Sequence, residues 1–122
     1  MPNELRLLIR LAAATANQCR YCTAHQRHQL IGLGVSEAKM AAIWNPGGDG
    51  LSTRERAAVR FAQAITLDAG GIPETVYADF IREFTPKERV EVAIIATSMG
   101  MLNKLNDGLR VPLEAEFEPL VV

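Results

Sequence analysis

Two short segments carry the signature of a capped helix start, and this feature constrains the fold most. Both Ser52-Thr53-Arg54-Glu55 and Thr85-Pro86-Lys87-Glu88 place a hydroxyl three residues before a glutamate. In this capping box, the two side chains satisfy backbone donors that the first helical turn leaves unpaired. Pro86 also stands at the first helical position, which favours proline. The two segments therefore predict helices that begin near residues 52 and 86.

The remainder of the chain is also helical in pattern, and no strand pattern is convincing. Val90, Ile94 and Met101 follow helical spacing along one face of the segment that begins at Pro86. Gly34 is a natural end for an earlier helix, because glycine adopts the left-handed conformation freely. We therefore expect an all-α fold of about six helices, over residues 4–16, 18–33, 36–44, 52–67, 73–84 and 86–107.

The end of the chain follows a different pattern. Residues 1–109 are expected to form the domain, whereas residues 110–122 contain two prolines and an apolar end, which predicts an extended tail. The apolar residues of this tail are poorly placed in water, so we expect it to pack on the domain or on a neighbouring subunit. Disorder is the alternative. The apolar helix over 86–107 also needs partners on several sides, within the fold or from another subunit.

Composition favours one cytoplasmic domain. The chain has 122 residues, of which 48% are hydrophobic, so it can build a core without disulfides. The net charge is -1 and the basic residues are scattered among acids, which argues against nucleic-acid binding. No apolar run approaches the ~20 residues that cross a bilayer. The charged start of the chain lacks the layout of a signal peptide. We expect a cytoplasmic protein that binds neither nucleic acid nor membrane.

The two cysteines of the chain, Cys19 and Cys22, lie near the start of the second expected helix. In a reducing compartment, a pair at this spacing is more often catalytic or metal-binding than structural. Three-residue spacing on a helix brings the sulfurs close enough for an intramolecular disulfide. The helix N-terminus and Arg20 favour a thiolate at Cys19, so we expect a lowered cysteine pKa there. The pair is therefore predicted to be redox-active, with one thiolate attacking and the other resolving the intermediate.

Two histidines follow the cysteines on the same expected helix. His25 is three residues after Cys22 and shares its helix edge, so it is a candidate base or ion-pair partner for the thiol. The alternative is that His25 lines the polar edge of the helix. His28 lies a further turn along and rotates away from Cys22. We therefore name His25, and not His28, as a catalytic candidate.

A metal site is the rival interpretation, because cysteine and histidine are zinc ligands. Each three-residue step falls about 60° short of a helical revolution, so the side chains turn about half a circle between Cys19 and His28. No second cysteine cluster exists to complete the site. A c-type haem attachment requires histidine where Thr23 stands, and a thioredoxin motif follows a strand rather than an alanine-rich segment. We expect neither a metal nor an organic cofactor.

The segment from Leu11 to Gly34, with Cys-Arg-Tyr-Cys at its centre, resembles the carboxymuconolactone decarboxylase family, in the branch of alkylhydroperoxidase D. Residues 51–58, 71–77 and 102–106 are also similar to that branch. The resemblance implies an alkylhydroperoxidase D-like helical bundle that forms a homo-oligomer, often a trimer or hexamer. It also implies thiol-dependent reduction of peroxides or electron transfer to a peroxiredoxin, with Cys22 attacking and Cys19 resolving. Relatives often carry an additional N-terminal helical segment, so we expect this chain to be short among them.

The resemblance also implies an acid and a base beside the cysteines, and here the sequence departs from the family. The family glutamate would stand at Leu7 and the family histidine at Gln26. Glu4, one turn before Leu7, and His25, one residue before Gln26, are the nearest replacements. We therefore name Cys22, Cys19, His25 and Glu4 as catalytic candidates. A shift of one residue turns a side chain about 100° around a helix, so a rebuilt relay and a weak peroxidase both stay open.

These observations predict a thiol-dependent oxidoreductase, either a peroxidase or a disulfide reductase, that cycles the Cys19 and Cys22 pair. Its substrate would be a peroxide or a disulfide. A thiol or dithiol would donate electrons, with a peroxiredoxin as one candidate partner. A non-enzymatic redox sensor or oligomeric scaffold is the first alternative, because the acid and base are altered. A decarboxylase or related lactone enzyme is the second, although such relatives generally lack the cysteine pair.

Overall fold

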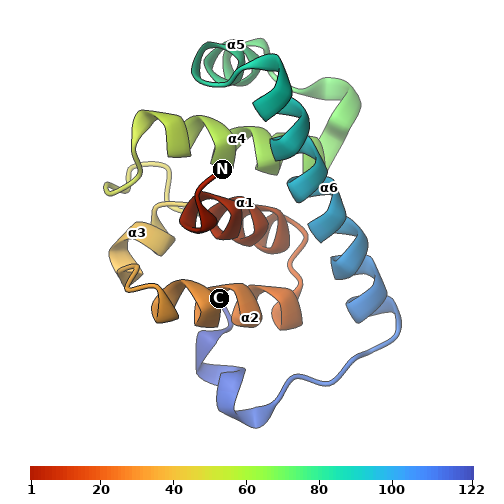
Figure 1. Ribbon diagram of the computed structural model, residues 1–122. Helices are drawn as coiled ribbons and strands as arrows, with labels where there is room; N and C mark the ends of the chain where they lie inside the picture. Colours follow the sequence, from red (N-terminus) through yellow and green to blue (C-terminus); the bar gives the residue numbers. More distant parts are fainter.

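The central element of the fold is α1 (Asn3–Ala16), which packs against α2 (Arg20–Gly32), α4 (Thr53–Asp68) and α6 (Pro86–Gly108) (Figure 1). This computed structural model describes all residues from 1 to 122. Shorter helices complete it: α3 (Glu37–Ala41), α5 (Glu74–Glu83) and the 3-10 helices η1 (Ala69–Gly71) and η2 (Ala115–Leu120). The structure contains no strand, which confirms the all-α prediction.

The core lies where α1 meets α4 and α6, and α5 packs on α4. Leu8, Ile9 and Leu11 of α1 are wholly inaccessible to solvent. Phe61 of α4 stacks on Phe80 of α5 with ring centroids 3.7 Å apart. Burying side chains of this size contributes about 1.5–3 kcal/mol each, so this layer fixes α1 relative to the rest of the fold.

Both predicted capping boxes are present. The Ser52 hydroxyl accepts a hydrogen bond from the Glu55 backbone N–H at 3.1 Å, and the Glu55 carboxylate accepts from the Ser52 N–H at 2.9 Å. Thr85 and Glu88 repeat this exchange at 3.3 and 2.9 Å. The two helices therefore begin where the sequence predicted.

Three helices end in the same type of turn, with a left-handed residue just past the end: Gln18, Gly34 and Arg110, at φ 57°, 84° and 53°. After α1, the Cys19 N–H donates to the Ala14 carbonyl at 3.0 Å, which is the Schellman pattern. Glycine tolerates this conformation, whereas other residues lose about 1–2 kcal/mol in it. The prediction for Gly34 is thus confirmed. The strained turn at Gln18 sets the position of Cys19.

The C-terminal tail is not wholly extended, which corrects the prediction for residues 110–122. It leaves α6, turns back and forms η2, which packs along α2 (Figure 1). Local bonds hold the turns, such as the one from the Phe117 N–H to the Glu114 carbonyl at 3.0 Å. The tail therefore covers α2, although none of its residues is fully buried.

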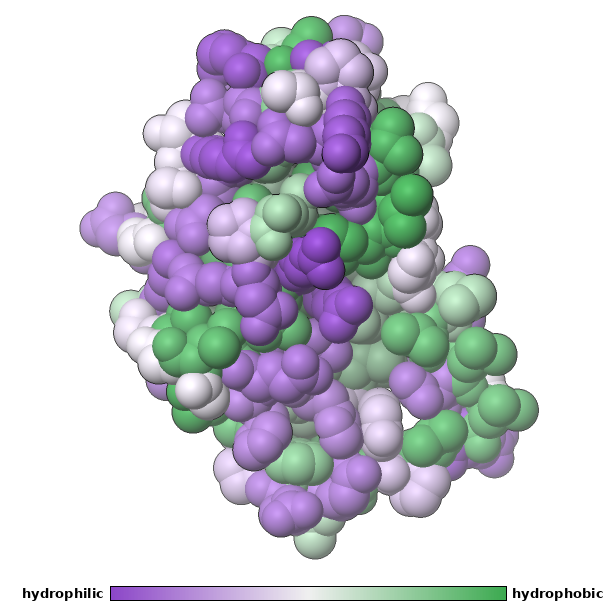
Figure 2. All heavy atoms as spheres, viewed as in Figure 1, coloured by the Kyte–Doolittle hydropathy of each residue, from purple (hydrophilic) through white to green (hydrophobic).

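One long face of α6 is apolar and exposed. Val90, Ile94 and Met101 are 58%, 57% and 59% exposed, and Leu105 continues the face at 50%. Figure 2 shows hydrophobic side chains along this side of the molecule. No helix of the chain is long and apolar enough to cross a membrane.

Candidate functional site

Cys19 and Cys22 lie together where α2 begins, as the spacing predicted. Cys19 is the N-cap residue of α2, and its Sγ accepts a hydrogen bond from the Cys22 backbone N–H at 3.4 Å. The two thiols are also hydrogen-bonded neighbours. Both are free and buried, with exposures of 0% and 4%. The turn at Gln18 and the first turn of α2 therefore hold a reduced dithiol below the surface.

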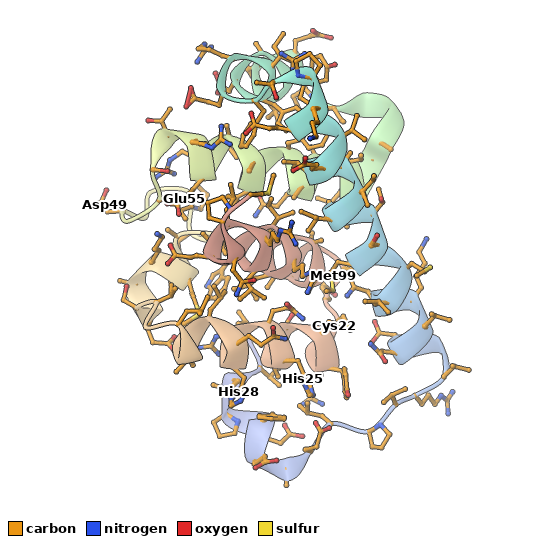
Figure 3. All side chains as sticks on the ribbon, in the orientation of Figure 1. Cys22, His25, His28, Asp49, Glu55 and Met99 are labelled. Carbon is orange, nitrogen blue, oxygen red and sulfur yellow. The ribbon has the colours of Figure 1, made fainter.

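The cysteines lie between three helices. Ala13 and Ala14 of α1 and Met99 of α6 pack against them (Figure 3). Asn106, near the end of α6, donates a hydrogen bond from Nδ2 to the Cys22 sulfur at 3.3 Å. The small alanine side chains allow α2 to approach α1 closely. As a result, Cys22 meets one polar side chain in surroundings that are otherwise apolar.

The pKa expected for Cys19 was wrong in direction. Burial, and after it the hydrogen bond with the Cys22 thiol, raises the pKa of Cys19 above its ordinary value. Arg20 does not oppose this effect, because its guanidinium donates to Glu118 at 2.8 Å on the surface. The Asp107 carboxylate accepts the hydrogen of the Cys19 thiol and raises the pKa further. Cys19 therefore rests as a protonated thiol, which suits a resolving role better than an attacking one.

His25 faces the C-terminal tail. Its Nε2 lies 2.9 Å from a carboxylate oxygen of Glu114, and its ring stacks on Tyr21 with centroids 4.2 Å apart. Phe117 of η2 meets the other side at 4.7 Å, edge to face. His28 also lies on this side of α2 (Figure 3). The structure thus places His25 against the tail, with its side-chain hydrogen bond to Glu114 and none to Cys22.

Glu4 lies far from the dithiol. Its carboxylate accepts a hydrogen bond from the Lys39 ammonium at 2.5 Å, and Glu55 accepts from the same group at 3.0 Å. Ala14, which anchors Cys19, is ten residues further along α1, a rise of about 15 Å. The structure therefore does not bring Glu4 to the cysteines, and the pairing of Glu4 with His25 in a rebuilt relay has no geometric support.

The two positions where the family carries its acid and base are buried. Leu7 is 3% exposed and belongs to the apolar core. Gln26 is 7% exposed and lies one turn after Cys22 on the same helix face. The Oε1 atom of Gln26 has no hydrogen-bond partner. Uncharged side chains therefore stand at both positions of the family relay, Leu7 on α1 and Gln26 on α2.

Asn106 and Asp107 are the site residues that sequence reasoning missed. Both are far along the chain from the cysteines, and Asn106 is 84 positions after Cys22. In the sequence, residues 102–106 carry only the family resemblance. A polar pair at the end of an apolar helix was the one signal that the sequence offered. It does not indicate which helix start the pair will meet.

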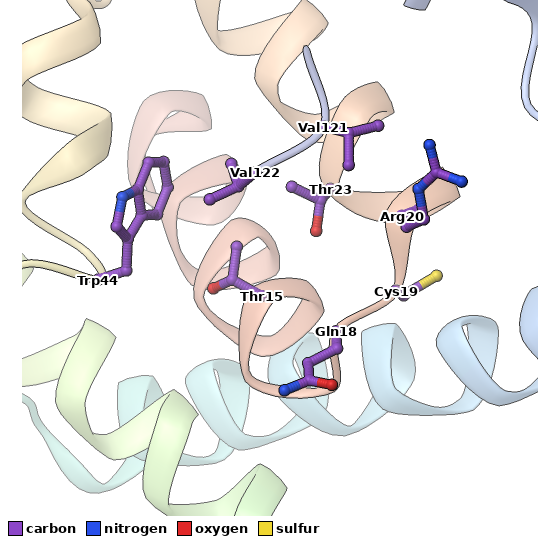
Figure 4. A pocket seen from close by; sticks show the side chains of 8 residues that line it. All are labelled: Thr15, Gln18, Cys19, Arg20, Thr23, Trp44, Val121 and Val122. Carbon is purple, nitrogen blue, oxygen red and sulfur yellow. The ribbon is translucent and has the colours of Figure 1, made fainter. Parts of the chain in front are cut away.

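Two surface pockets flank the dithiol. One, of about 410 Å³, lies between α2, the end of α6 and the tail, and its lining includes Tyr21, Asn106 and Asp107. The other, of about 540 Å³, lies beside Trp44 and Val122 (Figure 4). In that view the Cys19 sulfur points away from Trp44 and Val122. Cys19 is itself among the residues that line this second pocket, whereas neither cysteine lines the first. The first pocket is bordered by Asn106, whose amide contacts the Cys22 sulfur, and it is therefore the approach to Cys22. Nowhere do three or more histidine, cysteine or acidic side chains gather as they would around a metal ion.

An all-helical bundle with a buried Cys-x-x-Cys at a helix start defines a class of small dithiol proteins. The chain belongs to the carboxymuconolactone decarboxylase family, whose match covers residues 1–64, just over half of its length. No curated protein matches the chain.

Solved structures share the fold. A protein of unknown function from Agrobacterium tumefaciens, for which a role as the antioxidant defence protein AhpD has been suggested, has a TM-score of 0.87 and 20% identity over 94% of this chain and 80% of that one. This likeness confirms the alkylhydroperoxidase D-like bundle. An uncharacterised peroxidase-related protein from Silicibacter has a TM-score of 0.84 and 18% identity, over 97% of this chain and 63% of that one.

The debrominase Bmp8 is a third similar structure, with a TM-score of 0.87 and 26% identity over 98% of this chain. A cysteine-to-alanine variant of Bmp8 in complex with 2,3,4-tribromopyrrole is 25% identical. The chain spans 65% of the length of Bmp8, so it is the shorter of the two.

Proposed function

We propose that the protein is a thiol-dependent oxidoreductase that cycles Cys19 and Cys22 between a dithiol and a disulfide. The observation that carries this proposal is the pair of adjacent thiols at the start of α2, with the Asn106 amide on the Cys22 sulfur at 3.3 Å. An amide donor stabilises a thiolate, and the attacking group is the thiolate. Cys22 is therefore the attacking residue and Cys19 the resolving one.

The reaction runs in two exchange steps. The Cys22 thiolate attacks one sulfur of a substrate disulfide, and the other sulfur leaves as a thiolate that takes a proton from water. Cys19 then loses its proton to Asp107 and attacks the Cys22 sulfur, which releases the second substrate thiol. The substrate gains two electrons and two protons, and the protein is left with the Cys19–Cys22 disulfide. An external thiol or dithiol, with a peroxiredoxin system as one candidate, restores the reduced pair.

A disulfide fits these surroundings better than a peroxide. Peroxide cleavage releases a hydroxide or alkoxide, and the pKa of water is about 15.7, so an acid must deliver a proton. A thiolate with an ordinary pKa of about 8.5 leaves a disulfide without such help. The Asn106 amide contacts Cys22, and the uncharged Leu7 and Gln26 stand where the family has its carboxyl and imidazole. This supports disulfide reduction as the main activity and peroxide reduction as a slow one.

Mass spectrometry of the reduced protein tests the cycle. With excess hydroxyethyl disulfide, we expect the wild type to lose two hydrogens as the internal disulfide closes. Cys19→Ser should stop at a mixed disulfide on Cys22, and Cys22→Ser should form neither product. Hydrogen peroxide, added in place of the disulfide, should oxidise the wild type more slowly. Equal turnover in the wild type and Cys22→Ser would refute the proposal.

Activity measurements separate this proposal from the two alternatives. A redox sensor would close its disulfide once and show no turnover with added thiol. A decarboxylase would keep its activity on a carboxylactone after both cysteines are replaced by serine. Because the dithiol needs a reducing compartment to be regenerated, the proposal also places the protein in the cytoplasm.

The similarity to Bmp8 favours a second candidate, reductive debromination. The two electrons of the dithiol would replace a carbon–bromine bond of a brominated pyrrole by carbon–hydrogen, releasing bromide and a proton as the disulfide forms. The pocket beside the thiols carries Tyr21, Pro112 and Leu113, which suit a flat apolar ring. Bromide release from a brominated pyrrole in the presence of dithiothreitol measures this activity. No release above that of Cys22→Ser would exclude it.

The exposed apolar face of α6 supports a homo-oligomer, for which the family resemblance implies a trimer or hexamer. An exposed row of large apolar side chains is more typical of an interface than of a monomer surface. Light scattering on the purified protein measures the number of subunits in the assembly.

A further inference from the structure

The C-terminal strap, which we define as residues 110–122, binds the first turns of α2 mainly through acidic groups. Glu118 accepts a hydrogen bond from Arg20 at 2.8 Å, and Glu114 lies 2.9 Å from the His25 ring nitrogen. One turn further, the Arg27 guanidinium donates to the Leu120 carbonyl at 2.6 Å. Arg20, His25 and Arg27 thus each face an oxygen of the strap, and Arg27 is also paired with Glu37.

An aromatic side chain lies between these polar contacts. The Phe117 ring meets the His25 ring at 4.7 Å and the His28 ring at 4.8 Å, measured between centroids. The imidazoles of α2 therefore bind a flat apolar ring, and Arg20 and Arg27 lie on either side of this site. Such a surface is complementary to a short acidic segment that carries one aromatic residue.

The strap is held loosely. None of its residues is fully buried. In its Arg20–Glu118 pair the two side chains are 64% and 50% exposed, and exposed ion pairs of this kind contribute little to stability. Competing chemistry of the same type can therefore displace the strap without unfolding the helices.

The strap also borders the approach to the dithiol. Val111, Pro112 and Leu113 line the same pocket as Asn106 and Asp107, which contact the two thiols. A protein disulfide that reaches Cys22 along this route meets the strap first. The basic face of α2 and the entrance to the sulfurs are therefore covered by one segment.

We propose that the start of α2, from Arg20 to His28, is a docking surface for an acidic segment of a redox partner protein, and that the strap occupies this surface as an internal mimic of that segment. The identity of the partner as a redox protein rests on the function proposed above. The docking surface itself does not, because it consists of charges and rings outside the dithiol.

The probe for this surface is a labelled peptide with the strap's own sequence, residues 112–122, added to the full chain. The double variant Glu114→Gln with Glu118→Gln loosens the internal strap. Glu116→Gln is the matched control, because Glu116 makes no ion pair or side-chain hydrogen bond. Fluorescence anisotropy measures binding of the peptide to each protein, in low and in physiological salt.

We expect the double variant to bind the peptide about five- to tenfold more tightly than the wild type, because the strap no longer competes as well. Glu116→Gln should bind like the wild type. A peptide with its three glutamates replaced by glutamine should bind the double variant about five- to tenfold more weakly than the acidic peptide. On the double variant, the cysteines should also react faster with a neutral aromatic disulfide than in the control.

Three results would overturn the proposal: equal affinity of the double variant and Glu116→Gln, equal binding of the acidic and the glutamine peptides, or a wild-type dimer that dissociates on loosening the strap. The last result would assign the surface to the strap of a second copy. Repeating the binding in Cys22→Ser separates the two proposals. Binding without disulfide cycling in the wild type keeps the surface and rejects the redox function, whereas cycling without binding does the reverse.

Discussion

Asn106 provides the sharpest test of the site, because it is the one polar side chain that contacts the Cys22 sulfur. Its Nδ2 lies 3.3 Å from that sulfur, in a partly buried position. A hydrogen bond to a charged group contributes about 1.5–3 kcal/mol. The long distance and the partial exposure favour the lower end, about 1.5 kcal/mol, which corresponds to a factor of about ten in an equilibrium. The Asn106→Leu variant keeps the volume and removes the donor.

We expect Asn106→Leu to reduce the fraction of Cys22 that is thiolate at neutral pH by about five- to tenfold. The measurement is the rate of alkylation by iodoacetamide in a Cys19→Ser background, where Cys22 is the single thiol. Asn106→Asp should react more slowly still, because a carboxylate repels the thiolate. In denaturant all these proteins should react at one rate.

A native Asn106→Leu variant that reacts as fast as its parent would refute this role of the amide. Such a result would mean that the amide does not stabilise the thiolate. A faster reaction would mean that the side chain only covers the sulfur.

Three further predictions concern the fold. The backbone N–H of Thr85 lowers the pKa of Glu88 to about 2, so its stabilising effect is complete above the ordinary carboxyl pKa and is lost as the pH falls through about 2. Urea unfolding of Glu88→Gln should therefore show a weaker loss of stability between about pH 4.5 and 2 than the wild type. Gln18→Gly should raise the free energy of unfolding by about 0.5–1 kcal/mol, because glycine relieves the left-handed strain; a lower melting temperature would contradict this. Ile94→Glu should shift the proposed oligomer towards monomer in light scattering, whereas the exposed Arg6→Glu on α1 should not.

Much of the fold could be predicted because its signals are local. A capping box or a left-handed glycine depends on a few neighbouring residues, and the helices at Ser52, Thr85 and Gly34 therefore began or ended as expected. The structure of the C-terminal tail was harder to predict. Its η2 helix is stabilised by contacts with α2, which its own sequence does not contain.

Only the part of the candidate site that lies within one helix turn could be predicted from the sequence. The spacing of Cys19 and Cys22 was sufficient to place their sulfurs together, because both belong to one helix turn. The pKa direction of Cys19 was missed, since burial comes from α1 and α6 and not from the helix start. His25 was paired with the wrong group for the same reason, because the tail that attracts it is 89 residues away in the chain.

The departures from the family pattern are mutually consistent. With Leu7 in the core and Gln26 buried one turn after Cys22, neither position of the family relay carries an acid or a base. A disulfide has no need of such a relay, but it requires that a bulky partner reach the sulfur of Cys22, a residue that is only 4% exposed. A loosely held acidic strap over a basic helix start meets that requirement, because a partner with the same chemistry can replace it. The loss of the relay and the presence of the strap therefore both favour exchange with a partner protein over reduction of a small peroxide.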